Sequence, residues 1–408
     1  MKKTIKLALV AALALGATSA FATNGTNLIG YGAKSRAMGG TGISNFNGAE
    51  SAFANPALIG KATKNTEATV GATILMPSVS FKADAAANGA LSGGTQTADS
   101  SNDSTAGDGM IPAVAVINKV NDTFSWGLAL YGTAGMGVDY RTDTADSAIT
   151  QNKTNNSLLL MRMSIPLAYN FSGVSVAFAP VVEYGSLAMA EYAPTGNPAN
   201  GTQSGVTTDM AVGFEIGAAY EISGVSFGLD YKSAVTHDFK NTFTSYSATG
   251  TANSELDTPA ILGLGVSYKF GANVIALDYK NIAYSSAKGL EDFGWEDQTV
   301  IGLGYEYKAS NWAARVGYNY GASPLPTEVT DAASFNQVAG SLMQFPAVTE
   351  SHYTFGGSYS FNDAMSIDGA FVYATGSAST TLPASFGGGT IEAVNDQTSL
   401  TVALNYGF

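Results

Sequence analysis

The last nine residues of the chain, LTVALNYGF at positions 400–408, decide the fold class. Every second residue from Leu400 to Phe408 is apolar or aromatic, and the residues between them are small or polar. Strict alternation of this kind is typical of a β-strand with one apolar face and one wet face. In a sequence rich in Gly and Tyr, a final strand of this type indicates an outer-membrane β-barrel, with Phe408 as its C-terminal signal residue.

The first 22 residues have the pattern of a cleaved secretory signal. Three lysines precede a short apolar run, Leu7 to Leu15, and the small residues Ala20 and Ala22 mark a cleavage site. The mature chain is therefore expected to begin at Thr23. The apolar run is too short for a transmembrane anchor, which needs about 20 residues.

The composition excludes several classes of function. The signal holds three of the 19 basic residues and none of the 32 acidic ones, so the mature chain keeps 16 basic residues and a net charge of −16. Such an acidic chain is not expected to bind nucleic acid, whose phosphates attract basic proteins. Without cysteine there is no disulfide, thiolate metal site or Cys nucleophile. We expect no metal and no cofactor, and no apolar stretch after the signal is long enough for a spanning helix.

Two kinds of connection alternate along the mature chain. Short connections carry turn residues between alternating runs, which is typical of β-hairpins, and long connections are polar and rich in Gly, Ser, Thr, Asn and Asp. Six short and seven long connections predict 14 antiparallel strands, with short turns on the periplasmic side and long loops outside the cell. The short connections lie at 121–122, 170–173, 223–224, 271–273, 310–311 and 362–363, and the long ones near 85–107, 141–154, 193–206, 244–255, 287–297, 322–350 and 377–396.

Charged residues of both signs lie on the wet face of the predicted strands. An Arg or Lys that faces lipid at mid-depth costs roughly 2–4 kcal/mol, so these residues are expected to face the lumen. Such residues more often form a salt-bridged network than a ligand site. A soluble β-sandwich is the alternative fold, but it gives no reason for the sorting of short and long connections. The charged residues are Arg162, Glu183, Glu215, Asp230, Lys232, Asp278, Lys280, Glu306, Arg315 and Asp368.

Residues 23–62 do not alternate, and we expect them to form a hatch that plugs the lumen of a barrel made by residues 63–408. Glycines such as Gly39 and Gly40 interrupt short apolar stretches, and the motif Asn55-Pro56-Ala57 follows. This pattern favours short helices and turns over a strand. A disordered tail is the alternative, but the apolar content of the segment argues against it.

Several motifs resemble the FadL family of outer-membrane transporters, which serve long-chain fatty acids and other hydrophobic compounds, toluene and xylene among them. The opening GYGAKSRAMGG at 30–40 and the Asn55-Pro56-Ala57 motif carry the resemblance, which covers essentially the whole mature chain. FSWG at 124–127, SPLP at 323–326 and LNYGF at 404–408 support it, although the closing motif is common to outer-membrane barrels.

The resemblance implies an all-β, 14-stranded monomeric barrel in the outer membrane of a Gram-negative bacterium. Its expected partners are membrane lipid, lipopolysaccharide and the barrel-assembly machinery. Substrate would be captured at the extracellular loops, pass to a pocket above the hatch, and leave sideways beside a kinked third strand after a hatch movement. The third predicted strand, Phe124 to Tyr140, contains Gly132, Gly135 and Gly137, which permit a bend or bulge.

Ligand contacts are predicted in the loop at 322–350 and on the wet face. Apolar residues in an exported polar loop are candidates for capturing a hydrophobic molecule, and they equally suit a lid over the barrel mouth. A fatty acid, an alkane or an aromatic hydrocarbon fits such a site. If the substrate is a carboxylate, its expected partner is a lumen cation. The capture candidates are Leu325, Phe335, Leu342, Met343 and Phe345, and the candidate carboxylate partners are Arg162, Lys232, Lys280 and Arg315.

Three other classes of function fit the sequence less well. An enzyme would depend on His237 or His352, the two histidines of the chain, and neither lies in a nucleophile motif. A general diffusion porin has no use for a partly apolar hatch in its lumen. A surface adhesin is compatible with the polar loops.

Overall fold

The computed structural model describes residues 24–141, 154–189, 205–240 and 254–408. The predicted signal peptide, residues 1–22, lies outside these ranges, and so do most of the long connections predicted at 141–154, 193–206 and 244–255. No helix within the described ranges is both long and apolar enough to span a membrane.

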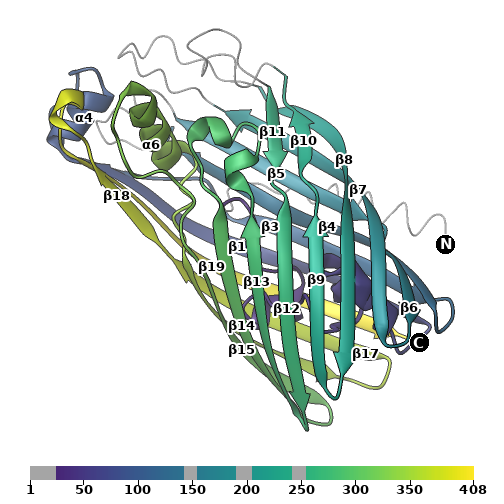
Figure 1. Cartoon of the computed structure of the whole chain (residues 1–408). Helices are drawn as coiled ribbons and strands as arrows, with labels where there is room; N and C mark the ends of the chain where they lie inside the picture. Colours follow the sequence, from purple (N-terminus) through teal and green to yellow (C-terminus); the bar gives the residue numbers. More distant parts are fainter. Residues whose placement is uncertain (1–23, 142–153, 190–204, 241–253) are drawn as a thin grey trace.

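The described strands form a closed antiparallel barrel (Figure 1). The first strand pairs with the last along its length, from Glu67 opposite Gly407 to Ala83 opposite Ile391, and this pairing closes the wall. Several wall strands are made of successive pieces: β2 and β3, β5 and β6, β9 and β10, β11 and β12, and β17 and β18. Counted as continuous strands, the described residues give the 14 strands that the sequence predicts.

The strand bounds are β1 (Thr66–Ala83), β2 (Ser100–Asp103), β3 (Gly109–Lys119), β4 (Phe124–Asp139), β5 (Asn155–Ser164), β6 (Leu167–Phe171), β7 (Val174–Met189), β8 (Thr207–Ile222), β9 (Val225–Lys232), β10 (Val235–Asp238), β11 (Glu255–Thr258), β12 (Ile261–Phe270), β13 (Asn273–Ile282), β14 (Gln298–Lys308), β15 (Trp312–Gly321), β16 (Ser351–Ser360), β17 (Met365–Thr375), β18 (Ser377–Thr381) and β19 (Thr390–Gly407).

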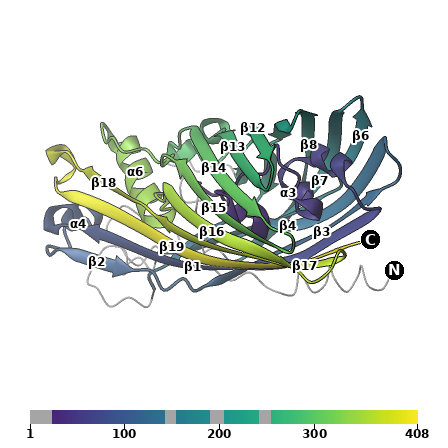
Figure 2. The same cartoon turned by 90° about the horizontal axis from the view of Figure 1, so that it is seen from below.

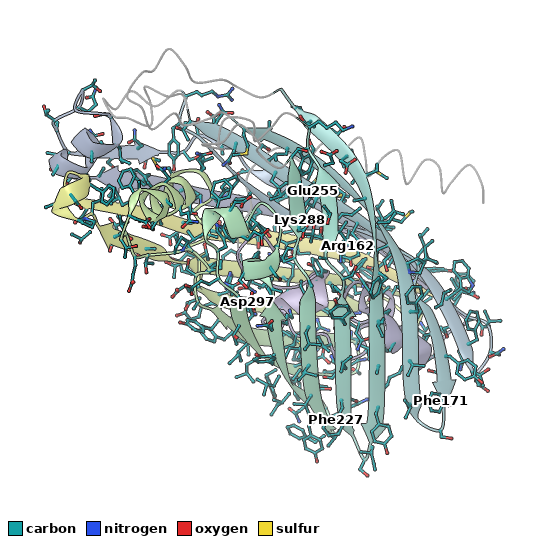
Figure 3. All side chains as sticks on the ribbon, turned by 45° about the horizontal axis from the view of Figure 1, so that its top comes forward. Arg162, Phe171, Phe227, Glu255, Lys288 and Asp297 are labelled. Atoms are coloured by element: carbon teal, nitrogen blue, oxygen red, sulfur yellow. The ribbon has the colours of Figure 1, made fainter. Side chains whose placement is uncertain are left out.

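The alternation in the sequence sorts side chains between the outside and the inside of the barrel. On β12, Leu262 and Leu264 are 43% and 47% exposed, whereas Ser267, on the opposite face, is buried. Phe171 and Phe227 project from the outer surface near the end that carries the short turns (Figure 3). Exposed apolar side chains in nearly every strand are unfavourable in water and suit lipid, as predicted.

Two of the predicted long connections contain strands. The connection predicted at 377–396 includes β18 and the start of β19, and the one at 85–107 includes β2. The alternation fails here because the strands are polar on both faces, as in the SASTT of β18, which still pairs with β19. A strand that extends beyond the lipid needs no apolar outer face.

The helices gather in two places. Most lie at the end of the barrel with the long connections, called the loop end, opposite the turn end (Figure 1). The loop at 322–350 contains a helix that the sequence did not predict, which begins after Asp331, whose carboxylate accepts the N–H of Ser334 at 2.8 Å. The hatch helices lie inside the ring of strands (Figure 2). The loop-end helices are α4 (Ala85–Leu91), η4 (Tyr284–Ser286), η5 (Glu291–Phe293), α6 (Ala332–Gln344) and η6 (Ala384–Phe386), and those of the hatch are α2 (Ala33–Ala37), η1 (Gly48–Glu50), α3 (Ser51–Ala54) and η2 (Pro56–Lys61).

Candidate functional site

The hatch, residues 24–62 of the structure, lies directly against the backbone of the inner wall. A Cβ atom on Gly304 of β14 would lie 2.6 Å from the Cβ of Met38. On the hatch side, Gly39 has a φ of 67°, and a Cβ there would lie 2.5 Å from the carbonyl oxygen of Tyr318. Glycine is therefore required on both surfaces. The wall glycines that touch the hatch are Gly217, Gly228, Gly263, Gly265, Gly302, Gly304, Gly317, Gly321 and Gly356.

Asn55 ties the hatch to the wall. Its amide nitrogen donates to the carbonyl oxygen of Ile43 at 2.8 Å and to that of Ala218 on β8 at 3.2 Å. Its side-chain oxygen accepts the N–H of Ala57 at 3.0 Å. Pro56 begins η2, where a missing N–H has no cost because the first helical N–H lacks a partner anyway. The predicted hatch motif thus joins two parts of the hatch to one barrel strand.

Strand β13 holds the hatch with charges of both signs. The carboxylate of Asp278 accepts the N–H groups of residues 42–43 at 2.8 and 3.0 Å. The ammonium of Lys280 donates to the carbonyl oxygens of Ile29 at 2.9 Å and Gly40 at 3.0 Å. Lys280, a predicted partner of a substrate carboxylate, is therefore engaged with the hatch.

A buried ionic network surrounds Arg162, which lies at mid-height in the barrel (Figure 3). Its Nε donates to Glu183 at 2.8 Å and an Nη to Glu215 at 3.2 Å. Lys232 lies 3.3 Å from both Glu215 and Asp230. Arg162 and Lys232, two further candidate cations, are therefore paired with carboxylates of the barrel itself. This arrangement is the salt-bridged network that the sequence favoured.

Arg315, the fourth candidate cation, lies at the turn end. It contacts Glu306 and the hydroxyl of Ser358, each at 2.6 Å. It also lines a polar cavity of about 690 Å³ that extends to the hatch at Lys34. All four candidate cations therefore face acceptors of the protein, and a role for any of them in binding a substrate carboxylate stays a prediction.

We expect the substitution Arg162→Gln to destabilise the folded barrel by about 3–5 kcal/mol, because Glu183 loses its buried guanidinium partner and Glu215 keeps only Lys232. Thermal melting, followed by the shift in gel mobility of folded barrels, measures the loss. The control is Lys82→Gln, which breaks an exposed pair with Glu392 at 3.2 Å and is expected to cost less than about 1 kcal/mol. If uptake of laurate falls relative to toluene at equal amounts of folded protein, Arg162 also recognises a carboxylate.

The wall contains a segment where neighbouring strands are not paired. Strands β3 and β4 pair from Lys119 opposite Ser125 to Ala113 opposite Tyr131, and in the described ranges their pairing ends there. The next residue of β3 is Pro112, which has no N–H to donate to a ladder.

Within the described residues, the next backbone hydrogen bond to β4 from this part of the chain lies at the loop end. There the N–H of Thr105, between β2 and β3, donates to the carbonyl oxygen of Asp139 at 2.7 Å. The unpaired part, called the β3–β4 seam, comprises residues 109–112 and 132–138 and is bounded at both ends by backbone hydrogen bonds.

Strand β4 changes character at the seam. Burial alternates up to Leu130, and then every residue from Tyr131 to Val138 is buried. A β-bulge accompanies the change, since Gly132 pairs with Met161 and Ala134 with Leu160, which leaves Thr133 without an opposite residue in the register with β5. A bulge bends and twists a strand. It lies in the stretch from Gly132 to Gly137 for which we predicted a kink.

A turn of the hatch covers the inner side of this bulge. The N–H of Gly135 donates to the carbonyl oxygen of Thr26 at 3.3 Å, and the N–H of Leu28 donates to that of Thr133 at 3.4 Å. The turn of residues 24–27, called the N-terminal turn, thus lies behind the seam.

Apolar side chains from three parts of the chain meet inside the seam. Leu28 of the hatch, Leu75 of β1 and Ile111 of β3 form one buried cluster. Met136 and Val138 of β4 belong to a larger cluster that fills the loop end of the barrel. The seam therefore connects with an apolar interior and not with the ionic network alone.

The predicted capture residues lie mostly inside that larger cluster. Leu342 and Met343 of α6 are at most 1% exposed, and Leu325 and Phe345 are 5% exposed. Phe335 is half-buried and stacks on Phe386, with ring centroids 5.4 Å apart. This packing suits the lid interpretation, and Phe335 is the candidate best placed to meet a ligand from outside.

Burial shifts the pKa of two hatch residues. It raises the pKa of Glu50, although the N–H groups of Ala33 and Lys34, each at 3.0 Å, favour the charged carboxylate. It lowers the pKa of Arg36 to about 10. Because burial raises the pKa of Glu50, the folded hatch favours the protonated carboxyl. The contribution of Glu50 to the stability of the hatch therefore falls as the pH rises through that pKa.

Sequence reasoning missed three residues of the site. Pro112 was visible as a proline within a strand pattern, which signals an interrupted ladder. Thr133 and Tyr284 carry no local signal, because the bulge and the contacts of Tyr284 with the N-terminal turn depend on segments far apart in the sequence.

Comparison with known proteins supports the fold. A family model described as "Outer membrane protein transport protein (OMPP1/FadL/TodX)" matches residues 7–408. A Pseudomonas aeruginosa FadL homologue has a TM-score of 0.70 at 16% identity, covering 94% of this chain and 100% of its own. The P. putida toluene transporter TodX has a TM-score of 0.68 at 19% identity, covering 94% and 99%. The Ralstonia pickettii toluene transporter TbuX has a TM-score of 0.61 at 18% identity, with the same coverage.

A curated relative adds a closer but shorter match. An uncharacterized protein from the 5′ region of a phosphoenolpyruvate carboxykinase gene of Chlorobium limicola is 45% identical over 82 residues. The match spans 20% of this chain and 40% of that relative's length.

Proposed function

Because the chain belongs to the outer-membrane transport protein family OMPP1/FadL/TodX, we propose that it takes up hydrophobic small molecules passively across the outer membrane. The observation that carries the proposal is the β3–β4 seam, an unpaired part of the wall that adjoins an apolar interior. The family consists of transport proteins, so the enzyme alternative built on His237 or His352 is set aside.

The route begins at the loop end, taken as the outer face of the membrane. A hydrophobic molecule meets Phe335 on α6 and enters the apolar cluster beneath it. From this cluster, Met136 and Val138 lead to the seam, where a movement of the N-terminal turn lets the molecule leave sideways into lipid. The third barrel strand, β4, thus supplies the lateral exit.

Partition supplies the driving force. Burial of each CH₂ group is worth roughly 0.8 kcal/mol, so an alkyl chain is held without directional bonds. Long-chain fatty acids, alkanes and aromatic hydrocarbons all fit this scheme, and the two toluene transporters with the same fold support the aromatic class. The protein acts as a monomer, with membrane lipid and lipopolysaccharide around it, after insertion by the barrel-assembly machinery.

A general diffusion porin fits the structure less well. The polar cavity at the turn end extends to the hatch, which contacts the wall at nine glycines. We therefore expect the purified protein to pass little steady current in a planar bilayer. Large steady currents would favour the porin.

The substrate class is open to direct identification. We expect purified protein to retain a hydrophobic molecule, since its loop-end cluster is apolar and enclosed. Organic extraction and mass spectrometry identify that molecule, with a general porin purified in the same detergent as the control. Recovery of only the lipids found with the porin contradicts the expectation.

A further inference from the structure

We propose that Tyr284 is a positioning residue that latches the N-terminal turn behind the β3–β4 seam and couples it to helix α6 at the loop end. This inference rests on the proposed lateral route and concerns its regulation. Tyr284 is the first residue of η4, in the connection that follows β13.

The hydroxyl group of Tyr284 holds the N-terminal turn. It donates to the carbonyl oxygen of Asn24 at 2.7 Å and accepts the N–H of Thr26 at 2.8 Å and the amide of Asn27 at 3.0 Å. A Cβ on Gly25 would collide with the phenol ring, and Gly25 has a φ of 61°. The turn is thus fitted closely to one buried hydroxyl.

The turn is bound more tightly to Tyr284 than to the seam. The turn and the residue after it, Leu28, make two backbone hydrogen bonds with β4, at Gly135 and Thr133, which measure 3.3 and 3.4 Å and are longer than ordinary N–H···O bonds. Three contacts with the Tyr284 hydroxyl measure 2.7 to 3.0 Å, and a fourth, with the hydroxyl of Thr26, measures 3.3 Å. Loss of the Tyr284 bonds therefore leaves the turn weakly held against the seam.

The ring of Tyr284 connects the turn to the loop-end helices. It packs edge-on against Trp295, with ring centroids 5.1 Å apart. The residue after Trp295, Glu296, donates its N–H to the carbonyl oxygen of Pro324 at 2.8 Å. The segment that carries Trp295 is therefore joined to the predicted capture loop at 322–350.

Helix α6 packs on the same segment. The rings of Phe293 on η5 and Phe345 at the end of α6 lie 5.3 Å apart. Ser341 donates to the carbonyl oxygen of Phe293 at 3.4 Å, and Gln337 donates to that of Asp292 at 3.1 Å. Contacts thus run without a break from α6 through η5, Trp295 and Tyr284 to the turn.

A ligand that enters this cluster has to displace side chains within it. Tyr284, Trp295, Phe293 and Phe345 all belong to the loop-end cluster, and closely packed interiors transmit such displacements. Entry of the ligand therefore displaces Tyr284, and the N-terminal turn moves away from the seam when a ligand is bound.

The absence of native cysteine allows a direct test in the full-length protein. Ala134→Cys places one thiol on β4, where Ala134 is 5% exposed and pairs with Asn27 of the turn. The rate at which maleimide labels this thiol in detergent reports how often the N-terminal turn moves away from β4. Tyr284→Phe keeps the ring and removes the hydroxyl, and we expect about three- to tenfold faster labelling.

The matched control is Tyr305→Phe, which removes a hydroxyl that donates to Asn273 at 2.6 Å on the outer surface. We expect it to leave labelling unchanged. If Tyr284→Phe does not fold, Asn27→Ala removes one latch bond without altering the tyrosine and is expected to give a smaller increase. Unchanged labelling in either latch variant, with the barrel folded, overturns the latch.

Coupling to α6 is tested with Phe345→Ala, which removes a ring at the far end of the path. We expect labelling to rise about two- to threefold and to rise no further when this change is added to Tyr284→Phe. Saturating toluene or laurate should raise the rate only while Tyr284 is present. Additive effects of the two substitutions overturn the coupling.

Failure of the latch and failure of the lateral route are distinguishable. The latch is read from labelling in purified protein, whereas a disulfide across the seam, formed in the double variant Ile111→Cys, Gly132→Cys, tests the route by uptake in cells. If labelling is unaffected by Tyr284→Phe but the disulfide blocks uptake, the latch is wrong and the route stands. If the disulfide leaves uptake intact, the route is wrong whatever labelling shows.

Discussion

Oxidation of the double variant Ile111→Cys, Gly132→Cys is expected to reduce uptake of hydrophobic probes to the level of cells that lack the protein. A Cβ on Gly132 would lie 3.7 Å from the Cβ of Ile111, within the range of disulfide geometry. The bond would join β3 to β4 in the middle of the seam, from the inner side. Uptake of radiolabelled toluene and laurate by intact cells, before and after reduction, measures the effect.

Reduction of the disulfide is the internal control, because it restores movement without changing the sequence. Each single cysteine variant should transport at least partly in both redox states. Gly132→Val should also slow transport, since its Cβ would lie 2.5 Å from the Cγ2 of Ile111 and crowd the seam. Full uptake through the oxidised double variant would show that cargo leaves by another path.

The second large effect is expected for Asn55→Ala, which should abolish selective uptake and let ions leak while the barrel stays folded. The change removes two buried hydrogen bonds, with Ile43 and Ala57, and a partly buried one with Ala218. Their combined loss is worth about 2–4 kcal/mol, roughly a 30-fold or larger shift in the hatch equilibrium. A displaced hatch no longer holds the N-terminal turn at the seam. Cell uptake and planar-bilayer conductance measure the two effects.

The matched control is Asn45→Ala. Asn45 also lies in the hatch, but its amide donates within the hatch, to Asn47 at 3.1 Å, and not to the barrel wall. We expect it to leave conductance and uptake close to those of the unaltered protein. Normal uptake by Asn55→Ala, or by a barrel without residues 24–62, would contradict a gating role for the hatch.

The strand number and the side of each strand were predictable because lipid enforces strict alternation. Leu262 and Leu264 face outward, and Ser267 faces inward, as the pattern requires. The prediction of strands was less accurate for segments outside the lipid, where nothing requires an apolar outer face. Strand β18, SASTT, is polar on both faces, and helix α6 lies in a loop whose apolar residues gave no clear period.

The candidate site was less predictable because it depends on contacts between distant segments. The kink predicted from the three glycines stays a prediction, and the bulge at Thr133, in the same stretch of β4, becomes visible only in the register with β5. The cations were correctly placed inside the barrel, yet Lys280 binds the hatch through carbonyl oxygens, which no side-chain pattern records. Tyr284 acts on residues about 260 positions away.

The wall glycines that touch the hatch have a consequence for engineering this transporter. Wall and hatch meet there through peptide groups, so their fit depends on the paths of two backbones rather than on side-chain identity. Any enlargement at Gly217 or Gly304 displaces the whole insert, whereas changes around Phe335 do not touch it. Variant libraries that seek new substrates should therefore change the residues around Phe335 and keep the wall glycines fixed. Grafts from relatives should transfer the hatch and the facing wall together.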